Sequence, residues 1–116
     1  MKNGLDYYKD FIDGLVKLKN GVDGKRILGN GYPDNDENQP FNELLAALTQ
    51  EQKEVLAKLV QKARLGGIHD TLAYMNEMMD CDDLVLSQNG EAFPHDEFDS
   101  MHFDFICRCE GDDWRK

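Results

Sequence analysis

The sequence predicts an α+β fold, with three or four N-terminal helices followed by a small C-terminal antiparallel sheet of two or three strands. Apolar residues recur at steps of three and four from Leu5 to Lys19 and again from Phe41 to about Asp80, as they do on one face of a helix. From Met101 to Cys109 they instead alternate with other residues, as they do along a strand. An Asn89-Gly90 pair, a strong hairpin signal, lies between the two regions. Because strands follow helices rather than alternate with them, α+β is favoured over α/β.

The first helix is predicted from Leu5 to Lys19, because apolar residues fall on one stripe of that stretch. The Asn20-Gly21 pair follows directly, and its tolerance of a positive φ angle favours a helix end there. The stripe consists of Leu5, Tyr8, Phe11, Ile12, Leu15 and Leu18.

The next segment, Gly21 to Gln39, carries four of the ten glycines and has no periodic apolar pattern. Its nineteen residues are long for a connection without structure in a compact domain. We therefore expect a functional loop, a mobile loop or a short strand hidden at Arg26-Ile27-Leu28.

Two or three further helices are predicted between residues 40 and 80. Pro40 suits the first turn of one helix, and Thr49-Gln50-Glu51-Gln52 has the form of a capping box that begins the next. Gly66-Gly67 predicts a stop or a kink, after which helical spacing resumes at Ile68.

The sheet is predicted from the short β-prone segment Leu84 to Ser87, the Asn89-Gly90 turn and the alternating segment Met101 to Cys109. A chain of 116 residues is long enough to bury a core without disulfides or metals, so we expect a single acidic α+β domain over residues 1–116. The sheet is expected to pack on the helices through Leu84, Leu86, Phe103, Phe105 and Cys107.

Charge and composition narrow the classes of function. The net charge is −10, and Asp80 to Lys116 contribute −8 of it. Such an acidic chain is repelled by nucleic acid and by anionic membranes, so neither is an expected partner.

No secretion signal or bilayer-spanning apolar stretch is found, and the three cysteines are an odd number, so we expect a cytoplasmic protein with reduced thiols.

The acidic C-terminal third predicts a protein-interaction module that binds a basic partner protein. Aromatic side chains are interspersed with its carboxylates, and such anchors ringed by charge suit a basic surface. Pairing of the acids with the basic helix face from Lys53 to Arg64, or plain solvation, stay open as alternatives, and the oligomeric state is not predicted. The expected binding residues are Phe93, Asp96, Glu97, Phe98, Asp99 and Trp114.

The alternative function is a small metal-dependent or acid/base enzyme that uses the Cys, His and carboxylate residues of segment 81–109. Cys81, His95 and His102 are the alternative metal ligands, because thiolate and imidazole are typical zinc ligands. Their spacing differs from the paired Cys-x2-Cys or His-x3-His pattern of zinc sites, so the interaction module is preferred. A strand would place His102 and Asp104 side by side for acid/base work, yet no catalytic residue is predicted.

The sequence predicts no cofactor. Asp34, Asp36 and Asn38 imitate the start of a calcium loop, but Gln39 stands where that loop needs glycine. Gly29-Asn30-Gly31 lacks the third glycine of a dinucleotide-binding fingerprint, and no phosphate-loop lysine follows a glycine run.

Two stretches, Leu65 to Asn76 and Asp104 to Trp114, resemble a small bacterial family of uncharacterised proteins, and the resemblance spans the whole chain. It implies a domain of unknown function and carries no activity, cofactor or site residue with it. In size, acidity and the order of helices before sheet, the chain is also similar to bacterial immunity proteins, which neutralise basic toxins. That second likeness is one of composition alone.

Overall fold

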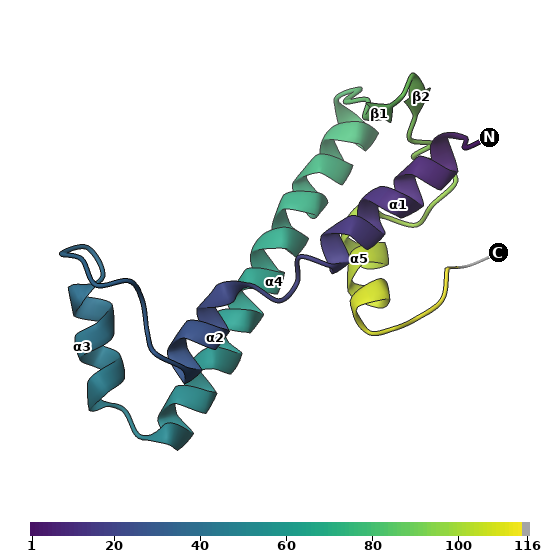
Figure 1. Ribbon diagram of the computed structural model, residues 1–116. Coiled ribbons are helices and arrows are strands. Elements are labelled where there is room, and N and C mark those ends of the chain that lie inside the picture. Colours follow the sequence, from purple (N-terminus) through teal and green to yellow (C-terminus); the bar gives the residue numbers. More distant parts are fainter. Residues whose placement is uncertain (115–116) are drawn as a thin grey trace. The chain divides into compact units, whose positions relative to one another are not determined.

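A computed structural model describes residues 1–114 of the chain (Figure 1). Within that range the chain forms five helices and one two-stranded antiparallel sheet, an α+β content in which the helices exceed the predicted three or four. The elements are α1 (Gly4–Val16), α2 (Val22–Leu28), α3 (Gln39–Ala47), α4 (Gln50–Cys81), β1 (Ser87–Gln88), β2 (Glu91–Ala92) and α5 (Met101–Cys109). None of the helices in residues 1–114 combines the length and the apolar character that crossing a lipid bilayer requires.

The chain divides into two compact units, and each is described by itself. The terminal unit consists of Met1–Lys19 and Gly66–Lys116, and the inner unit consists of Asn20–Leu65. Residues up to Leu65 of α4 belong to the inner unit, and those from Gly66 onward belong to the terminal unit.

In the inner unit, helix α2 occupies the first part of the segment that was predicted to be a loop or to hide a short strand. The predicted strand at Arg26–Leu28 is wrong, because these residues end helix α2, and Ile27 is buried beside Leu45 and Ala57. The rest of the predicted loop is tied to α3 by Asn42, whose side-chain amide accepts from the backbone N–H of Tyr32 at 2.8 Å and donates to its carbonyl at 3.0 Å. A short helix with one buried residue gives no repeating pattern for a sequence to reveal.

Helix α4 is continuous over 32 residues. Its predicted capping box is confirmed: the backbone N–H of Gln52 donates to the Thr49 hydroxyl at 3.2 Å, and the Gln52 side chain accepts from the Thr49 N–H at 2.9 Å. Of the two predicted outcomes at Gly66-Gly67, the stop is wrong, because the helix runs through both glycines. Each glycine costs about 1 kcal/mol relative to alanine in a helix interior, which helical neighbours on both sides can offset.

The terminal unit begins with α1, which starts three residues into the chain. Asn3 and Asp6 form a reciprocal capping box, in which each side chain accepts from the backbone N–H of the other at 3.0 Å. The helix ends at Val16, three residues before the predicted end at Lys19. Its buried stripe joins a core made by Tyr8, Ile12, Leu72, Met79, Phe93, Met101 and Phe105.

Helix α5 replaces the predicted C-terminal strand. Ser100 caps its start by accepting from the backbone N–H of Phe103, and Gly111 ends it at a φ of +90°. The N–H groups of Gly111 and Asp112 bond to the carbonyls of Arg108 and Cys107, which is the Schellman pattern of helix termination. The buried residues are Met101, Asp104 and Phe105, at helical rather than alternating spacing.

The observed sheet is smaller than predicted. The Asn89-Gly90 turn is confirmed, with φ angles of 51° and 80° that suit a tight hairpin, and it pairs Ser87 with Ala92. The hairpin lies against α1, where Gly4 contacts the Ala92 carbonyl so closely that no side chain fits. The predicted sheet packing through Leu84, Leu86, Phe103, Phe105 and Cys107 is wrong, because the last three lie on a helix.

Candidate functional site

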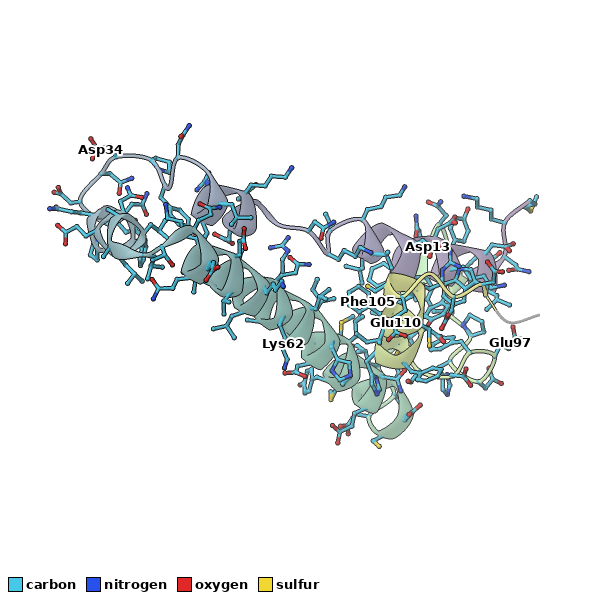
Figure 2. All side chains as sticks on the ribbon, turned by 90° about the horizontal axis from the view of Figure 1, so that it is seen from below. Asp13, Asp34, Lys62, Glu97, Phe105 and Glu110 are labelled. Atoms are coloured by element: carbon cyan, nitrogen blue, oxygen red, sulfur yellow. The ribbon has the colours of Figure 1, made fainter. Side chains whose placement is uncertain are left out.

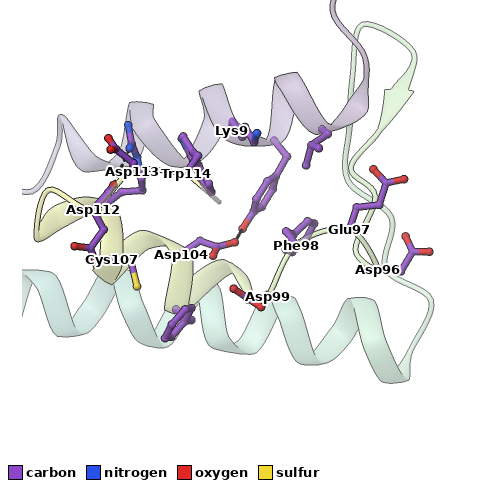
Figure 3. Close-up of a pocket in the computed structure, with 14 residues that line it drawn as sticks. Lys9, Asp96, Glu97, Phe98, Asp99, Asp104, Cys107, Asp112, Asp113 and Trp114 are labelled. Carbon is purple, nitrogen blue, oxygen red and sulfur yellow. Dashed lines mark hydrogen bonds between the residues drawn. The ribbon is translucent and has the colours of Figure 1, made fainter. Parts of the chain in front are cut away.

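A pocket of about 570 Å³ opens in the terminal unit (Figure 3). Its walls come from α1, from the segment before α5, from α5 itself and from the segment after it. Four aromatic side chains line it: Tyr8, Phe98, Phe103 and Trp114. Six carboxylates line it as well, namely Asp96, Glu97, Asp99, Asp104, Asp112 and Asp113, against two cations, Lys9 and Arg108. The formal charge of the lining is therefore −4.

Two of the lining residues, Tyr8 of α1 and Asp104 of α5, form a buried hydrogen bond with each other. The Tyr8 hydroxyl donates to Oδ2 of Asp104 at 2.6 Å, and the two residues are 0% and 8% exposed. Burial, and then the hydrogen bond to Asp104, raises the pKa of Tyr8 far above its usual value near 10. Tyr8 therefore stays protonated and holds the Asp104 carboxylate in place. Because this hydrogen bond joins residues that are 96 positions apart in the sequence, it fixes α1 relative to α5 in the pocket.

Aromatic rings surround Tyr8. Its ring stacks on Phe98 with 3.7 Å between centroids and 10° between planes, and it meets the edges of Phe93 and Trp114 at 5.8 and 5.9 Å. Phe98 is half-buried, so the stack joins the core to the pocket wall. Stacked and edge-on pairs of this kind contribute about 0.5 to 1.5 kcal/mol each beyond their buried area.

Asp13 holds the C-terminal end of the pocket together. Nε and Nη2 of Arg108 donate to its two carboxylate oxygens at 2.7 and 3.3 Å, and the Trp114 indole N–H donates at 3.1 Å. Burial alone would raise the pKa of Asp13, but the hydrogen bonds from Arg108 and Trp114 outweigh it and hold the pKa below its usual range. The guanidinium of Arg108 also lies over the Trp114 ring, 5.2 Å from its centroid. Arg108 is thus already engaged inside the protein.

Three exposed carboxylates, Asp96, Glu97 and Asp99, lie in the segment before α5. In the described residues neither Asp96 nor Glu97 takes part in a salt bridge. Figure 3 shows these two side chains at one end of the pocket, beyond Phe98, with Asp112 and Asp113 at the other end.

Five of the six predicted binding residues line this pocket, and their binding role stays a prediction. They are Asp96, Glu97, Phe98, Asp99 and Trp114. The sixth, Phe93, is 6% exposed and packs against Phe11 at 5.5 Å between ring centroids, so it is a core residue and not a surface anchor.

The sequence did not predict eight residues of the pocket lining as binding residues, and it gave Asp104 a different role. The eight are Leu5, Tyr8, Lys9, Phe103, Cys107, Arg108, Asp112 and Asp113. The apolar pattern correctly places Tyr8 on a buried stripe, but it does not predict the partner of the buried hydroxyl, which is Asp104 in the structure. Asp104 does not share a face with His102 as a strand would require, because two residues span about 200° of a helix.

The alternative metal ligands are not brought together. Cys81 ends α4, His95 is exposed in the segment after the hairpin, and His102 lies on α5 with its ring 5.2 Å from that of His69. Across residues 1–114, no three His, Cys, Asp or Glu side chains are arranged to hold a metal ion. The three cysteines are free thiols, and burial raises the pKa of Cys109.

Charge is divided unevenly between the two units. The terminal unit has sixteen Asp and Glu against seven Lys and Arg, a net of −9, whereas the inner unit has seven against six, a net of −1. The acidic pocket therefore belongs to the unit that carries nearly all of the net charge.

Comparison with known proteins places the chain in a family without naming an activity. No curated protein and no solved structure matches it. One family model matches residues 1–116, in agreement with the resemblance seen in the sequence. The chain therefore belongs to DUF6547, a family of unknown function.

Proposed function

We propose that the protein is a non-catalytic interaction module whose pocket in the terminal unit takes a basic side chain of a partner protein. The observation that supports this most is the lining of the pocket, in which six carboxylates and four aromatic rings face two cations. Lysine and arginine side chains gain from both groups, through charge pairing and through contact with aromatic faces, the latter contributing about 0.5 to 2 kcal/mol.

The two cations of the lining do not neutralise the pocket. The charge of Arg108 is balanced by Asp13, which lies outside the lining, and Lys9 lies near the Trp114 ring, 5.8 Å from its centroid. The exposed Asp96 and Glu97 stay available to an incoming cation. The net charge of −9 on the terminal unit would also raise the rate of encounter with a basic partner and make that rate depend on salt.

Trp114 provides a direct test of this proposal. It is the single tryptophan of the chain and lines the pocket, so its fluorescence reports on occupancy. We expect titration with a lysine-rich peptide to change the Trp114 emission with a saturable profile, and an equally long glutamate peptide to leave it unchanged. Raising the salt concentration should weaken the binding, because charge pairs near the surface are screened over about 8 Å at physiological ionic strength.

Two matched double variants separate binding in the pocket from general attraction to an acidic protein. Asp96→Asn with Glu97→Gln changes the pocket, whereas Asp82→Asn with Asp83→Asn makes the same change of charge at exposed positions outside the lining. We expect the first to weaken binding of the lysine-rich peptide at least about tenfold, equivalent to about 1.4 kcal/mol, and the second far less. Equal weakening by both variants would contradict the proposal.

A further inference from the structure

The inner unit exposes much apolar surface for its size. In residues 1–114, eleven large apolar side chains are exposed, and six of them belong to this unit, although it is the smaller of the two. Its core cluster is formed by Ile27, Leu45 and Ala57, one residue from each of its helices. Single exposed apolar residues are normal, whereas several in one small unit indicate a contact surface. The six are Val22, Leu28, Phe41, Leu44, Val55 and Leu59.

Two of these residues, Val55 and Leu59, form a stripe on the outward face of α4. They are 67% and 61% exposed. The opposite face of the helix is directed inward, because Ala57 is buried and Leu56 and Val60 pack against the core cluster. Residues four apart lie one above the other on a helix, so the two side chains make one continuous apolar surface.

Charged residues border the Val55–Leu59 stripe in a definite order. Glu51 and Glu54 precede its centre, and Lys58 and Lys62 follow it. Steps of three and four place all four along one side of the stripe. All four are exposed, and none of them takes part in a salt bridge within residues 1–114. These charges are therefore available to a molecule that covers the stripe.

The order of these charges is complementary to itself. If a second α4 packs antiparallel on the stripe, the order is reversed, and the two glutamates of each copy lie near the two lysines of the other. A two-fold symmetric contact has this reciprocal form. In a parallel pair, the glutamates of both copies would lie at one level and the lysines at another, which places like charges together. The four charges sum to zero, so they favour neither an acidic nor a basic protein of another kind.

We infer that the Val55–Leu59 stripe of α4 is a self-association surface, on which a second copy of the chain packs antiparallel to form a two-fold symmetric dimer. The inner unit has a net charge of −1, so two inner units repel each other little, whereas each terminal unit carries −9. The stripe and the acidic pocket belong to different units. This inference therefore goes beyond the proposed function and does not depend on it.

Sedimentation velocity of the 116-residue chain over a wide range of concentrations tests the inference. The mass should rise from that of one chain toward that of two as the concentration increases. Val55→Gln with Leu59→Gln should weaken the dimer at least about tenfold. Glutamine is a good helix former, so α4 should be retained, which circular dichroism checks. The control is Tyr74→Gln with Val85→Gln, at positions 62% and 67% exposed outside the inner unit, which should leave the dimer unchanged.

Two charge variants test the order of the bordering residues. Glu51→Lys with Glu54→Lys, and separately Lys58→Glu with Lys62→Glu, should each weaken self-association about tenfold or more, because like charges then face each other. An equimolar mixture of the two double variants should form a mixed dimer about as stable as the wild-type dimer. Recovery in the mixture separates contact between copies from a folding defect in either variant.

Several results would overturn the inference. One is a wild-type chain that stays monomeric at every concentration, and another is a dimer that persists when Val55 and Leu59 are replaced. A mixture of the charge variants that stays monomeric would also contradict the antiparallel contact. If Asp96→Asn with Glu97→Gln dissociates the dimer, the pocket and not the stripe holds the copies together. The lysine-rich peptide titration tests the proposed function separately, whichever of these results is found.

Discussion

Replacing Phe105 with alanine is expected to lower the free energy of unfolding by about 3 to 5 kcal/mol, the usual cost of truncating a fully buried phenylalanine. Phe105 has no exposed surface and lies in the core between α5 and the rest of the terminal unit (Figure 2). Alanine would leave a cavity lined by neighbours that can relax only in part. Chemical denaturation followed by circular dichroism measures the loss.

Phe103→Ala is the matched control. The two phenylalanines are two positions apart, which places them on the same face of a strand but on different faces of a helix. Because Phe103 is 44% exposed, its truncation should cost less than about 1.5 kcal/mol. Similar large losses for both variants would indicate that segment 101–109 is a strand with one buried face, as the sequence alone predicts, and would contradict helix α5.

Tyr8→Phe is expected to lower the free energy of unfolding by about 2 to 3 kcal/mol near neutral pH, because it removes a buried hydrogen bond to a charged group. The ring and its contacts with Phe98 and Phe93 are retained, so the loss reports on the hydroxyl. Without the Tyr8 hydroxyl, the Asp104 carboxylate is left buried without its 2.6 Å partner. Denaturation of the wild type and the variant at neutral pH gives the difference.

The same pair predicts a dependence on pH. Burial, and then the bond to Asp104, raises the pKa of Tyr8 in the folded protein, whereas in the unfolded chain it lies near 10. Above pH 10 the unfolded state therefore loses this proton while the folded state keeps it, so stability falls as pH rises, by up to about 1.4 kcal/mol per pH unit. Tyr8→Phe lacks this contribution. The difference between wild type and variant should be constant from neutral pH to about pH 10 and shrink above it. A difference that does not change above pH 10 would contradict the buried, protonated Tyr8.

Helices α1 and α3 and the start of α4 were predictable because their signals are local, whereas the short helix α2 was not. The Thr49–Gln52 capping box and the Asn89-Gly90 turn each depend on side chains within a few residues, and both form as expected. Helix α5 was misassigned because its aromatic and sulfur-containing residues happen to alternate. The contrary signals, Ser100 as N-cap and Gly111 as terminator, were present at its two ends and identify a nine-residue helix.

The pocket was predictable only in part. Acidic and aromatic residues that are adjacent in sequence, such as Asp96 to Asp99, stay adjacent in any fold. Local composition was therefore sufficient to predict that they lie together on one candidate binding surface. Tyr8 joins Asp104 across 96 positions, and Asp13 joins Arg108 across 95. Such pairs result from the packing of α1 on α5, and a single sequence contains no signal for that contact.

The most direct test of the central claim, that the pocket receives a cationic side chain, is a ¹⁵N NMR titration of the 116-residue chain with the lysine-rich peptide at physiological salt. The account predicts that the largest shifts occur at the backbone amides of Asp96 to Asp99 and at the Trp114 indole N–H, with little change at the exposed acidic residues Asp80 to Asp83. Shifts of equal size at Asp80 to Asp83 and in the pocket would contradict the account, because they would indicate diffuse attraction to an acidic surface.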